Sequence, residues 1–335
     1  MRLDGWRRSL RVLLTGRGRA PSKPGDWPSP VPEIRWFSRR EDYRRHLDPD
    51  HGGRRAREIE VGRRRTWRGL CTYCRSRRDF VVSAGVWLGQ NVNLREGLVC
   101  PVCGLKNRLR LLFKAVEEYA GPPAEMRKKR AYVAERLTTF YQRLASRIDD
   151  VVGSEYLGRH AVSGQTRRVG LHLVRHEDLC ALSFPDESFD LVIHADVLEH
   201  VPDFRRAFAE LHRVTRRGGG MFFSVPFLHD RDGDEVRASV QADGSIVHHL
   251  PAVYHGDPVD PKGALAYRTY GWSLLDTLRG VGFDAAEVGV LADLDLGFAS
   301  SNSPAEDFME PVVFRALRSA AGGPGACAAS ATSTT

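Results

Sequence analysis

Two Cys-x-x-Cys pairs are the clearest chemical signal in this sequence. Cys71 and Cys74 form the first pair, and Cys100 and Cys103 form the second after an interval of 25 residues. The turn within each pair lets both sulfurs face one tetrahedral centre, and two pairs complete a four-sulfur shell with Zn–S distances of ~2.3 Å. A closed shell leaves no coordination position for a substrate, so the spacing predicts a structural Zn²⁺ site. Redox-active dithiols are the alternative interpretation.

A second group of reactive side chains follows a short apolar run, Phe189 to Ile193. Such a run is typical of a strand buried in a parallel sheet. His194, Asp196, Glu199 and His200 come soon after it. Because ligands of open α/β sheets bind beyond the carboxyl ends of the strands, we expect these four side chains at the edge of a site.

Two carboxylates stand at the ends of other predicted strands. Glu155 lies near the end of the run 151–156, and Asp178 follows the run 168–174. Carboxylates accept hydrogen bonds, so this pair suits a ligand that presents a ribose diol and an amino group. The plainer interpretation of Asp178 is a carboxylate in a turn or a helix cap.

The elements that would position these side chains alternate between strand and helix from residue 130 onward. This alternation predicts an α/β fold with a Rossmann-like, doubly wound, mostly parallel sheet, preceded by a small zinc-ribbon-like unit. We expect strands at 131–134, 151–156, 189–193, 221–225 and 286–291, and helices at 105–119, 135–147, 204–214 and 272–279, with Gly218–Gly220 as a break. The expected organisation is a disordered basic N-terminus (1–32), an Arg-rich lead-in (33–68), a zinc-binding unit plus helix (69–120), the α/β domain (130–316, with an insertion at 227–270) and a disordered tail (318–335).

Several short runs occur in a characteristic order within residues 151–225. They are Val152-Gly-Ser-Glu155, Asp178 to Pro185, Ser188 to Val192, Asp196 to Pro202, and Gly218-Gly219. In this order they resemble class I S-adenosylmethionine-dependent methyltransferases of the type 11-like group. The resemblance implies S-adenosylmethionine as the cofactor and methyl transfer to an O or N acceptor that the sequence does not identify.

The resemblance also implies roles for individual residues. Glu155 corresponds to the acid that binds the ribose hydroxyls, and Asp178, with Leu179 beside it, corresponds to the acid that meets the adenine amino group. His194, Ala195 and Asp196 correspond to residues that line the methionine end of the cofactor.

The first motif departs from the family pattern. The family has a Gly-rich loop there, which lets the backbone approach the cofactor closely. Here the first strand is followed by Glu135-Arg-Leu-Thr138, without glycine. Either Glu135 and Thr138 hold the cofactor with their side chains, or cofactor binding is lost. A similar Glu-x-x-Thr in related methyltransferase-like chains favours a family-specific variant.

Histidines are the candidate bases, because imidazole has a pKa near ~6.5 and accepts a proton at neutral pH. His200 and His255 are the two predicted catalytic residues, and ordinary structural roles are the alternative for each. His248, His249 and Tyr254 are further candidates in the insertion. A metal held by histidines and Asp257 of this insertion is conceivable, but the ligand spacing is not a recognised one.

The charge is concentrated at the front of the chain. Residues 1–78 carry 22 Lys+Arg against 9 Asp+Glu, whereas residues 79–335 carry 28 against 33. A nucleic acid or another polyanion is therefore a candidate partner of the N-terminal region, with a solvated Arg-rich segment as the alternative. A cofactor-free binding scaffold and an accessory protein of glycan or natural-product assembly are the competing functions. Without a signal peptide or an apolar run of membrane-spanning length, we expect a cytoplasmic protein.

Overall fold

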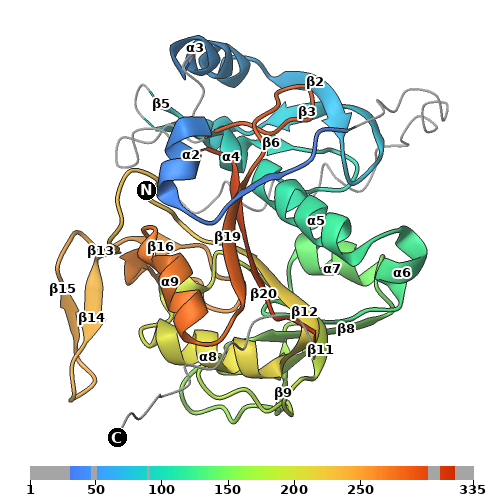
Figure 1. Cartoon of the computed structure of the whole chain (residues 1–335). Coiled ribbons are helices and arrows are strands. Elements are labelled where there is room, and N and C mark those ends of the chain that lie inside the picture. Colours follow the sequence, from blue (N-terminus) through green and yellow to red (C-terminus); the bar gives the residue numbers. More distant parts are fainter. Residues whose placement is uncertain (1–30, 47–50, 89–90, 301–309, 321–335) are drawn as a thin grey trace, which may run out of the picture.

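The computed structural model describes residues 31–46, 51–88, 91–300 and 310–320 (Figure 1). Residues 1–30 and 321–335, which make up most of the two segments expected to be disordered, lie outside the described residues. The helices are α2 (Arg40–His46), α3 (His51–Gly62), η3 (Ala84–Val86), α4 (Leu94–Gly97), α5 (Asn107–Ala120), α6 (Pro123–Arg127), α7 (Thr139–Ala145), η4 (Leu198–His200), α8 (Phe204–Val214) and α9 (Ser273–Gly280).

Strands of the central sheet are β1 (Arg35–Phe37), β7 (Arg130–Val133), β8 (Asp150–Glu155), β9 (Thr166–Val169), β10 (His172–His176), β11 (Phe189–Ala195), β12 (Thr215–Ser224), β19 (Ala285–Val290) and β20 (Val312–Leu317). The N-terminal unit has β2 (Thr66–Cys71), β3 (Ser76–Val82), β4 (Trp87–Leu88), β5 (Asn91–Val92) and β6 (Leu98–Val99). The insertion has β13 (Glu235–Val236), β14 (Ala238–Val240), β15 (Ile246–His248), β16 (Tyr254–His255), β17 (Ala264–Leu265) and β18 (Arg268–Thr269).

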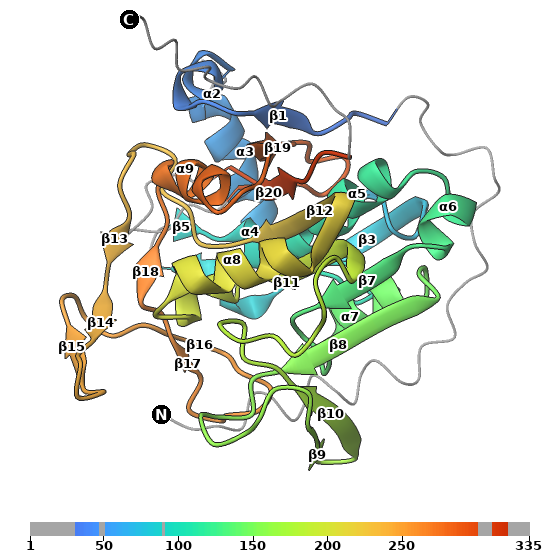
Figure 2. The ribbon, with the colours of Figure 1, turned by 60° about the horizontal axis from the view of Figure 1, so that its bottom comes forward.

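The central sheet has nine strands in the order β1-β19-β20-β12-β11-β7-β8-β10-β9 (Figure 2). Its middle strands, from β12 to β10, are all parallel. β20 is antiparallel to both of its neighbours, and β1 and β9 are antiparallel edge strands. The predicted Rossmann-like, mostly parallel sheet is thereby confirmed. Because the chain runs from β7 to β8 on one side and later to β11 on the other, the strand order reverses at β7, where such sheets bind ligands.

Both faces of the sheet are covered, as a doubly wound fold requires. Side chains of β11 alternate between the two faces, because successive residues of a strand point in opposite directions. Leu191 and Ile193 join the core that includes α5, α7 and the N-terminal unit. Val192 joins the core that includes α8 and α9.

Helix α8 has the boundaries that the sequence predicts. Its buried residues Phe204, Phe208 and Leu211 lie on one face, and the Asp203 carboxylate caps the first turn by accepting a hydrogen bond from the Arg206 N–H at 3.1 Å. The glycine prediction was wrong: α8 ends at Val214, and Gly218–Gly220 lie inside β12, which begins at Thr215, so the glycines do not end the helix. A Cβ atom at Gly219 would lie 2.7 Å from the carbonyl oxygen of Asp190, so only glycine allows this close approach of β11 and β12.

The N-terminal unit is built onto the α/β domain. Within residues 33–68, where no strand was predicted before the zinc unit, β1 pairs with β19 at one edge of the central sheet. β2, β3 and β6 form a separate three-stranded sheet. Its Leu70 N–H donates to the carbonyl oxygen of Asp295 at 2.6 Å, and buried side chains of this unit share one core with β7 and β11.

The insertion 227–270 forms small two-stranded ribbons, β13 with β18, β14 with β15 and β16 with β17. Their short, irregular strands explain the absence of a clear hydrophobic period. Among the helices of the described residues, none combines the length and the apolar composition that a membrane crossing requires.

Candidate functional site

The four predicted metal ligands lie together. The sulfur of Cys71 is 3.8 Å from that of Cys103, and the sulfur of Cys74 is 3.8 Å from that of Cys100. All four sulfurs lie within 4.8 Å of one another. A tetrahedron with Zn–S bonds of ~2.3 Å has edges of about 3.8 Å, so the cluster has the dimensions of a four-sulfur metal site.

This cluster is held against α7 of the α/β domain. The Arg143 guanidinium donates to the carbonyl oxygen of Cys103 at 2.7 Å, and the Tyr73 hydroxyl lies 2.8 Å from that of Ser146. The Arg147 guanidinium donates to the carbonyl oxygen of Tyr73 at 3.0 Å. The first Cys-x-x-Cys turn is therefore fixed by the same helix that follows the first strand of the sheet.

Glu155 shapes the loop that replaces the Gly-rich motif. Its Oε1 accepts hydrogen bonds from the backbone N–H groups of Arg136 and Leu137, both at 2.8 Å. The expected helix 135–147 begins only at Thr139, because residues 135–137 form this loop instead. Burial raises the pKa of Glu155, and the two backbone donors oppose that effect. Within the described part of the chain, Oε2 of Glu155 has no hydrogen-bond donor.

Glu135 lies in the same loop and is buried. Burial raises its pKa to about 7, and the nearby charges of Glu155 and Asp196 add to the increase. Its Oε1 is buried without a hydrogen-bond partner. Thr138 caps α7: its hydroxyl oxygen accepts the Tyr141 N–H at 3.1 Å. The loop thus presents one unpaired buried acceptor atom, Oε1 of Glu135, near the carboxylates of Glu155 and Asp196.

Asp196 connects the end of β11 to the N-terminal unit. It has a positive φ of 52° and accepts hydrogen bonds from both Arg95 and the Ser224 hydroxyl, at 3.1 and 2.7 Å to Oδ1. Arg108 lies 3.3 Å from its Oδ2. Burial alone would raise the pKa of Asp196, but the two guanidinium groups hold it well below its usual range. Glu96 completes the network through contacts with Arg95, Lys106 and Arg108.

Replacing Arg95 with methionine is expected to destabilise the protein by about 3–5 kcal/mol, because one partner of a buried charge pair is removed. The Arg95 side chain is only 7% exposed. Denaturant unfolding of the full chain measures the effect. Arg68→Ala is the control, since it breaks an exposed ion pair with Asp79 that contributes about 0–1 kcal/mol. Equal effects of the two changes would contradict the structural role of Arg95.

The other predicted cofactor residues take different positions. Ala195 ends β11 and is partly exposed. The Asp178 Oδ1 accepts the Cys180 N–H at 2.9 Å, as in an Asx turn, and Leu179 is buried beneath it. His194 is fully buried, with its ring stacked on Phe223 at a centroid distance of 4.7 Å. Burial lowers the pKa of His194 to about 3, so its imidazole is neutral.

The two predicted catalytic histidines meet. Nδ1 of His255, in β16 of the insertion, lies 3.1 Å from Nε2 of His200 in η4. Nδ1 of His200 lies 2.9 Å from the carbonyl oxygen of Leu265. The fully buried Glu199 places Oε1 at 3.3 Å from Nδ1 of His255 and raises the pKa of His255. The other insertion histidines are outside this cluster: His248 is exposed, and His249 bonds to Ser239.

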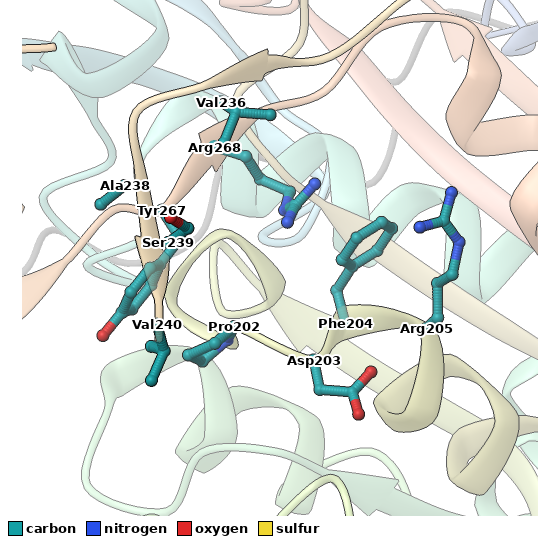
Figure 3. Close-up of a pocket in the computed structure, with 10 residues that line it drawn as sticks. All are labelled: Pro202, Asp203, Phe204, Arg205, Val236, Ala238, Ser239, Val240, Tyr267 and Arg268. Carbon is teal, nitrogen blue, oxygen red and sulfur yellow. The ribbon is translucent and has the colours of Figure 1, made fainter. Parts of the chain in front are cut away.

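A pocket of about 520 Å³ has Pro202, two residues after His200 in the chain, in its lining (Figure 3). It is lined by the start of α8 and by the insertion, and the Arg268 guanidinium covers the Phe204 ring at 3.8 Å. Tyr267, another lining residue, donates its backbone N–H to the carbonyl oxygen of Glu199 at 2.8 Å. None of the residues expected to bind the cofactor lines this pocket.

Comparison with known proteins finds a similarity to methyltransferase domains. The methyltransferase-domain family model matches residues 138–223, which include β8, β10, β11 and most of β12. Demethylmenaquinone methyltransferase of Geobacillus stearothermophilus is 46% identical over 52 residues, or 15% of this chain. The matched segment spans 22% of that relative's length.

Solved structures of low sequence identity were also found. One is an S-adenosylmethionine-dependent methyltransferase of Mesorhizobium loti, with 19% identity, a TM-score of 0.37, and coverage of 62% of this chain and 96% of the other. Another is the 1,6-didemethyltoxoflavin-N1-methyltransferase of Burkholderia thailandensis with bound 1,6-didemethyltoxoflavin and S-adenosylhomocysteine. It has 15% identity, a TM-score of 0.39, and coverage of 63% and 78%.

Sequence reasoning missed Arg95 and Arg108, which reach the end of β11 from the N-terminal unit. Both lie outside the residues that carry the methyltransferase resemblance. Burial of both guanidiniums depends on the docking of the two parts of the chain, and no local pattern encodes that docking. Glu199 was placed at the site edge, but its burial beside His255 depends on the folded insertion.

Proposed function

We propose that this protein is an S-adenosylmethionine-dependent methyltransferase. The observation that carries the proposal is the methyltransferase-domain match over residues 138–223, within which Glu155 stands at the end of β8 beside the point where the strand order reverses. This combination favours an enzyme over a cofactor-free binding scaffold. The methyl acceptor, whether an O or an N nucleophile, is not identified.

The residues at the strand ends fit such a cofactor. Oε2 of Glu155 is available to accept from ribose hydroxyls, and Asp178 and Leu179 would border the adenine. Glu135 offers a buried, unpaired carboxylate oxygen to the ammonium group of the methionine end, near Ala195 and Asp196. When bound, the cofactor supplies a methyl group on a positively charged sulfur. Thr138 and Asp196 would act as positioning residues, since their side chains already bind the protein.

Isothermal titration of the full chain with S-adenosylmethionine and S-adenosylhomocysteine tests this proposal. We expect saturable one-to-one binding of both. Absence of binding at millimolar concentrations by protein that is folded and carries its zinc would overturn it.

The affinity for S-adenosylmethionine is expected to rise as the pH increases from 6 to 8. Burial raises the pKa of Glu135 to about 7, so the carboxylate that would attract the cofactor's positive charge forms across this range. Ionising a group with a raised pKa costs stability, so the free protein should lose about 1.4 kcal/mol between pH 6 and pH 8, the interval that contains the pKa of about 7. Titrations and denaturant unfolding at pH 6 and pH 8 measure both effects. Glu135→Gln should flatten both profiles, and Glu125→Gln, on exposed α6, should leave them unchanged.

We also propose that Cys71, Cys74, Cys100 and Cys103 bind a structural Zn²⁺ ion. Support comes from the sulfur–sulfur distances of 3.8 Å, which match a tetrahedral site. Buried Arg110 supports the same region: its guanidinium donates to the carbonyl oxygens of Leu98, Leu105 and Gly297 at 2.6–2.9 Å. Four thiolates fill the coordination shell, so the ion would stabilise the N-terminal unit and take no part in methyl transfer.

The pocket between α8 and the insertion is the proposed acceptor site, because its lining residue Tyr267 donates its backbone N–H to the carbonyl oxygen of Glu199, which belongs to the histidine cluster. The phenol group of Tyr267 in its lining favours an acceptor with polar groups, whereas the Arg268 guanidinium is already paired with Asp234 at 3.2 Å. The nucleic-acid prediction concerns the basic residues of positions 1–78, of which positions 1–30 lie outside the described residues, and it stays a prediction. The predicted cytoplasmic location likewise stays a prediction.

A further inference from the structure

We propose that Glu199, His200 and His255 bind a divalent transition-metal ion, separate from the four-cysteine site. Three ligand atoms converge: Oε1 of Glu199, Nε2 of His200 and Nδ1 of His255. Their separations are 3.1 Å between the two nitrogens, 3.3 Å between the Glu199 oxygen and His255, and 3.7 Å between that oxygen and His200. A tetrahedral ion with bonds of 2.0–2.2 Å has edges of about 3.4 Å between its ligands, which is close to the mean of these three distances.

The state of Glu199 gives independent support. Its side chain is 0% exposed, Oε2 is buried without a hydrogen-bond partner, and the polar contacts of Oε1 are the imidazole nitrogens of His255, at 3.3 Å, and His200, at 3.7 Å. A carboxyl group in such surroundings needs a compensating cation or hydrogen-bond donors. Burial of Glu199 beside two imidazole nitrogens thus provides the charge and the softer ligands that zinc and similar ions prefer.

The orientation of His200 is that of a metal ligand. Its Nδ1 lies 2.9 Å from the carbonyl oxygen of Leu265, so an N–H there fixes the ring with Nε2 turned toward the cluster. Metal-bound histidines almost always donate their second N–H to a carbonyl or carboxylate in this way. The Tyr267 N–H donates to the Glu199 carbonyl at 2.8 Å and holds the same segment of the insertion against η4.

Two histidines and one glutamate leave a fourth position open on a tetrahedral ion, which is the composition of several catalytic zinc sites. A catalytic role for this ion rests on the proposed methyl transfer. The open position would take a water or the hydroxyl of an acceptor and lower its pKa, which favours loss of the proton before attack on the methyl group. His255 would then act as a ligand and not as a free base.

Titration of the full-length protein with Co²⁺, in the absence of S-adenosylmethionine, tests the proposal. We expect one Co²⁺ equivalent beyond the four-cysteine site, with the weak visible absorption of nitrogen and oxygen ligands. His255→Ala should weaken this binding by more than about 100-fold, because even second-shell changes cost 10–100-fold. Glu199→Gln, which keeps the shape of the side chain, should also weaken it. His248→Ala, which removes an exposed histidine of the same insertion, should bind Co²⁺ like the unaltered protein.

The proposal is overturned when the protein takes up no further Co²⁺ at 1 mM, or when His255→Ala and Glu199→Gln leave the uptake unchanged. Metal uptake without cofactor does not depend on methyl transfer, so this outcome is distinct from a failure to bind S-adenosylmethionine. Circular dichroism of each variant identifies any loss of binding that comes from unfolding of the insertion.

Discussion

Cys100→Ser is expected to remove the tightly bound zinc and to destabilise the protein by more than about 4 kcal/mol, as the loss of a structural metal can do. The free energy of zinc binding is coupled to folding, because the four sulfurs converge only in the folded unit. Cys100 begins the turn that leads to α5, and α5 carries Arg108 toward Asp196. Disorder of this turn would therefore also loosen the ion pairs of Arg108 with Glu96 and Asp196 at the end of β11, and would weaken cofactor binding.

Metal analysis after dialysis against a chelator, together with denaturant unfolding, measures both parts of this expectation. Cys180→Ser is the matched control, since Cys180 is partly buried but belongs to no metal cluster in the described residues. It should keep one zinc equivalent and lose little stability. Full retention of chelator-resistant zinc by the Cys71→Ser, Cys100→Ser double variant would rule out the four-sulfur site.

Glu155→Ala is expected to lower the affinity for S-adenosylhomocysteine by at least about 100-fold. The change removes the proposed ribose contact and also the two bonds, at 2.8 Å, that hold the loop at Arg136 and Leu137. Hydrogen bonds to a charged group contribute about 1.5–3 kcal/mol each, and two of them account for an effect of this size. Isothermal titration of folded protein measures the affinity.

The substitution Glu155→Gln separates charge from shape. The amide oxygen still accepts from the loop, so we expect a smaller loss of about tenfold, with stability close to that of the unaltered protein. Glu125→Ala, on exposed α6, controls for the loss of one negative charge. An affinity that is unchanged in both Glu155 variants would contradict the placement of the cofactor at β8.

Local patterns predicted the parts of this fold that rest on short-range physics. The apolar run at Phe189 identified β11, the amphipathic spacing after Asp203 identified α8, and the two Cys-x-x-Cys turns identified the cluster that the structure assembles. Each of these signals lies within a few residues of the chain, where periodicity and turn chemistry dominate.

Long-range features escaped prediction for a common reason. Arg95 reaches Asp196 across 101 residues of sequence, and His255 reaches His200 across 55. Arg35 of β1 pairs with Val290 of β19, and Gly220 of β12 pairs with Leu317 of β20, so both pairings join distant parts of the sequence. These pairings follow from the assembled tertiary structure, which residue spacing alone does not encode.

The bonds between the N-terminal unit and residues 294–299 bear on how the chain folds during synthesis. Asn107 donates to the carbonyl oxygen of Ala299 at 2.7 Å, and Arg110 donates to that of Gly297 at 2.8 Å. Chains fold progressively as they leave the ribosome, from the N-terminus onward. The acceptors of these buried donors are synthesised 192 and 187 residues later. The N-terminal unit is therefore synthesised early, but its core is completed only after residues 294–299 have been made. We expect a fragment that ends before residue 294 to leave the N-terminal unit susceptible to proteolysis.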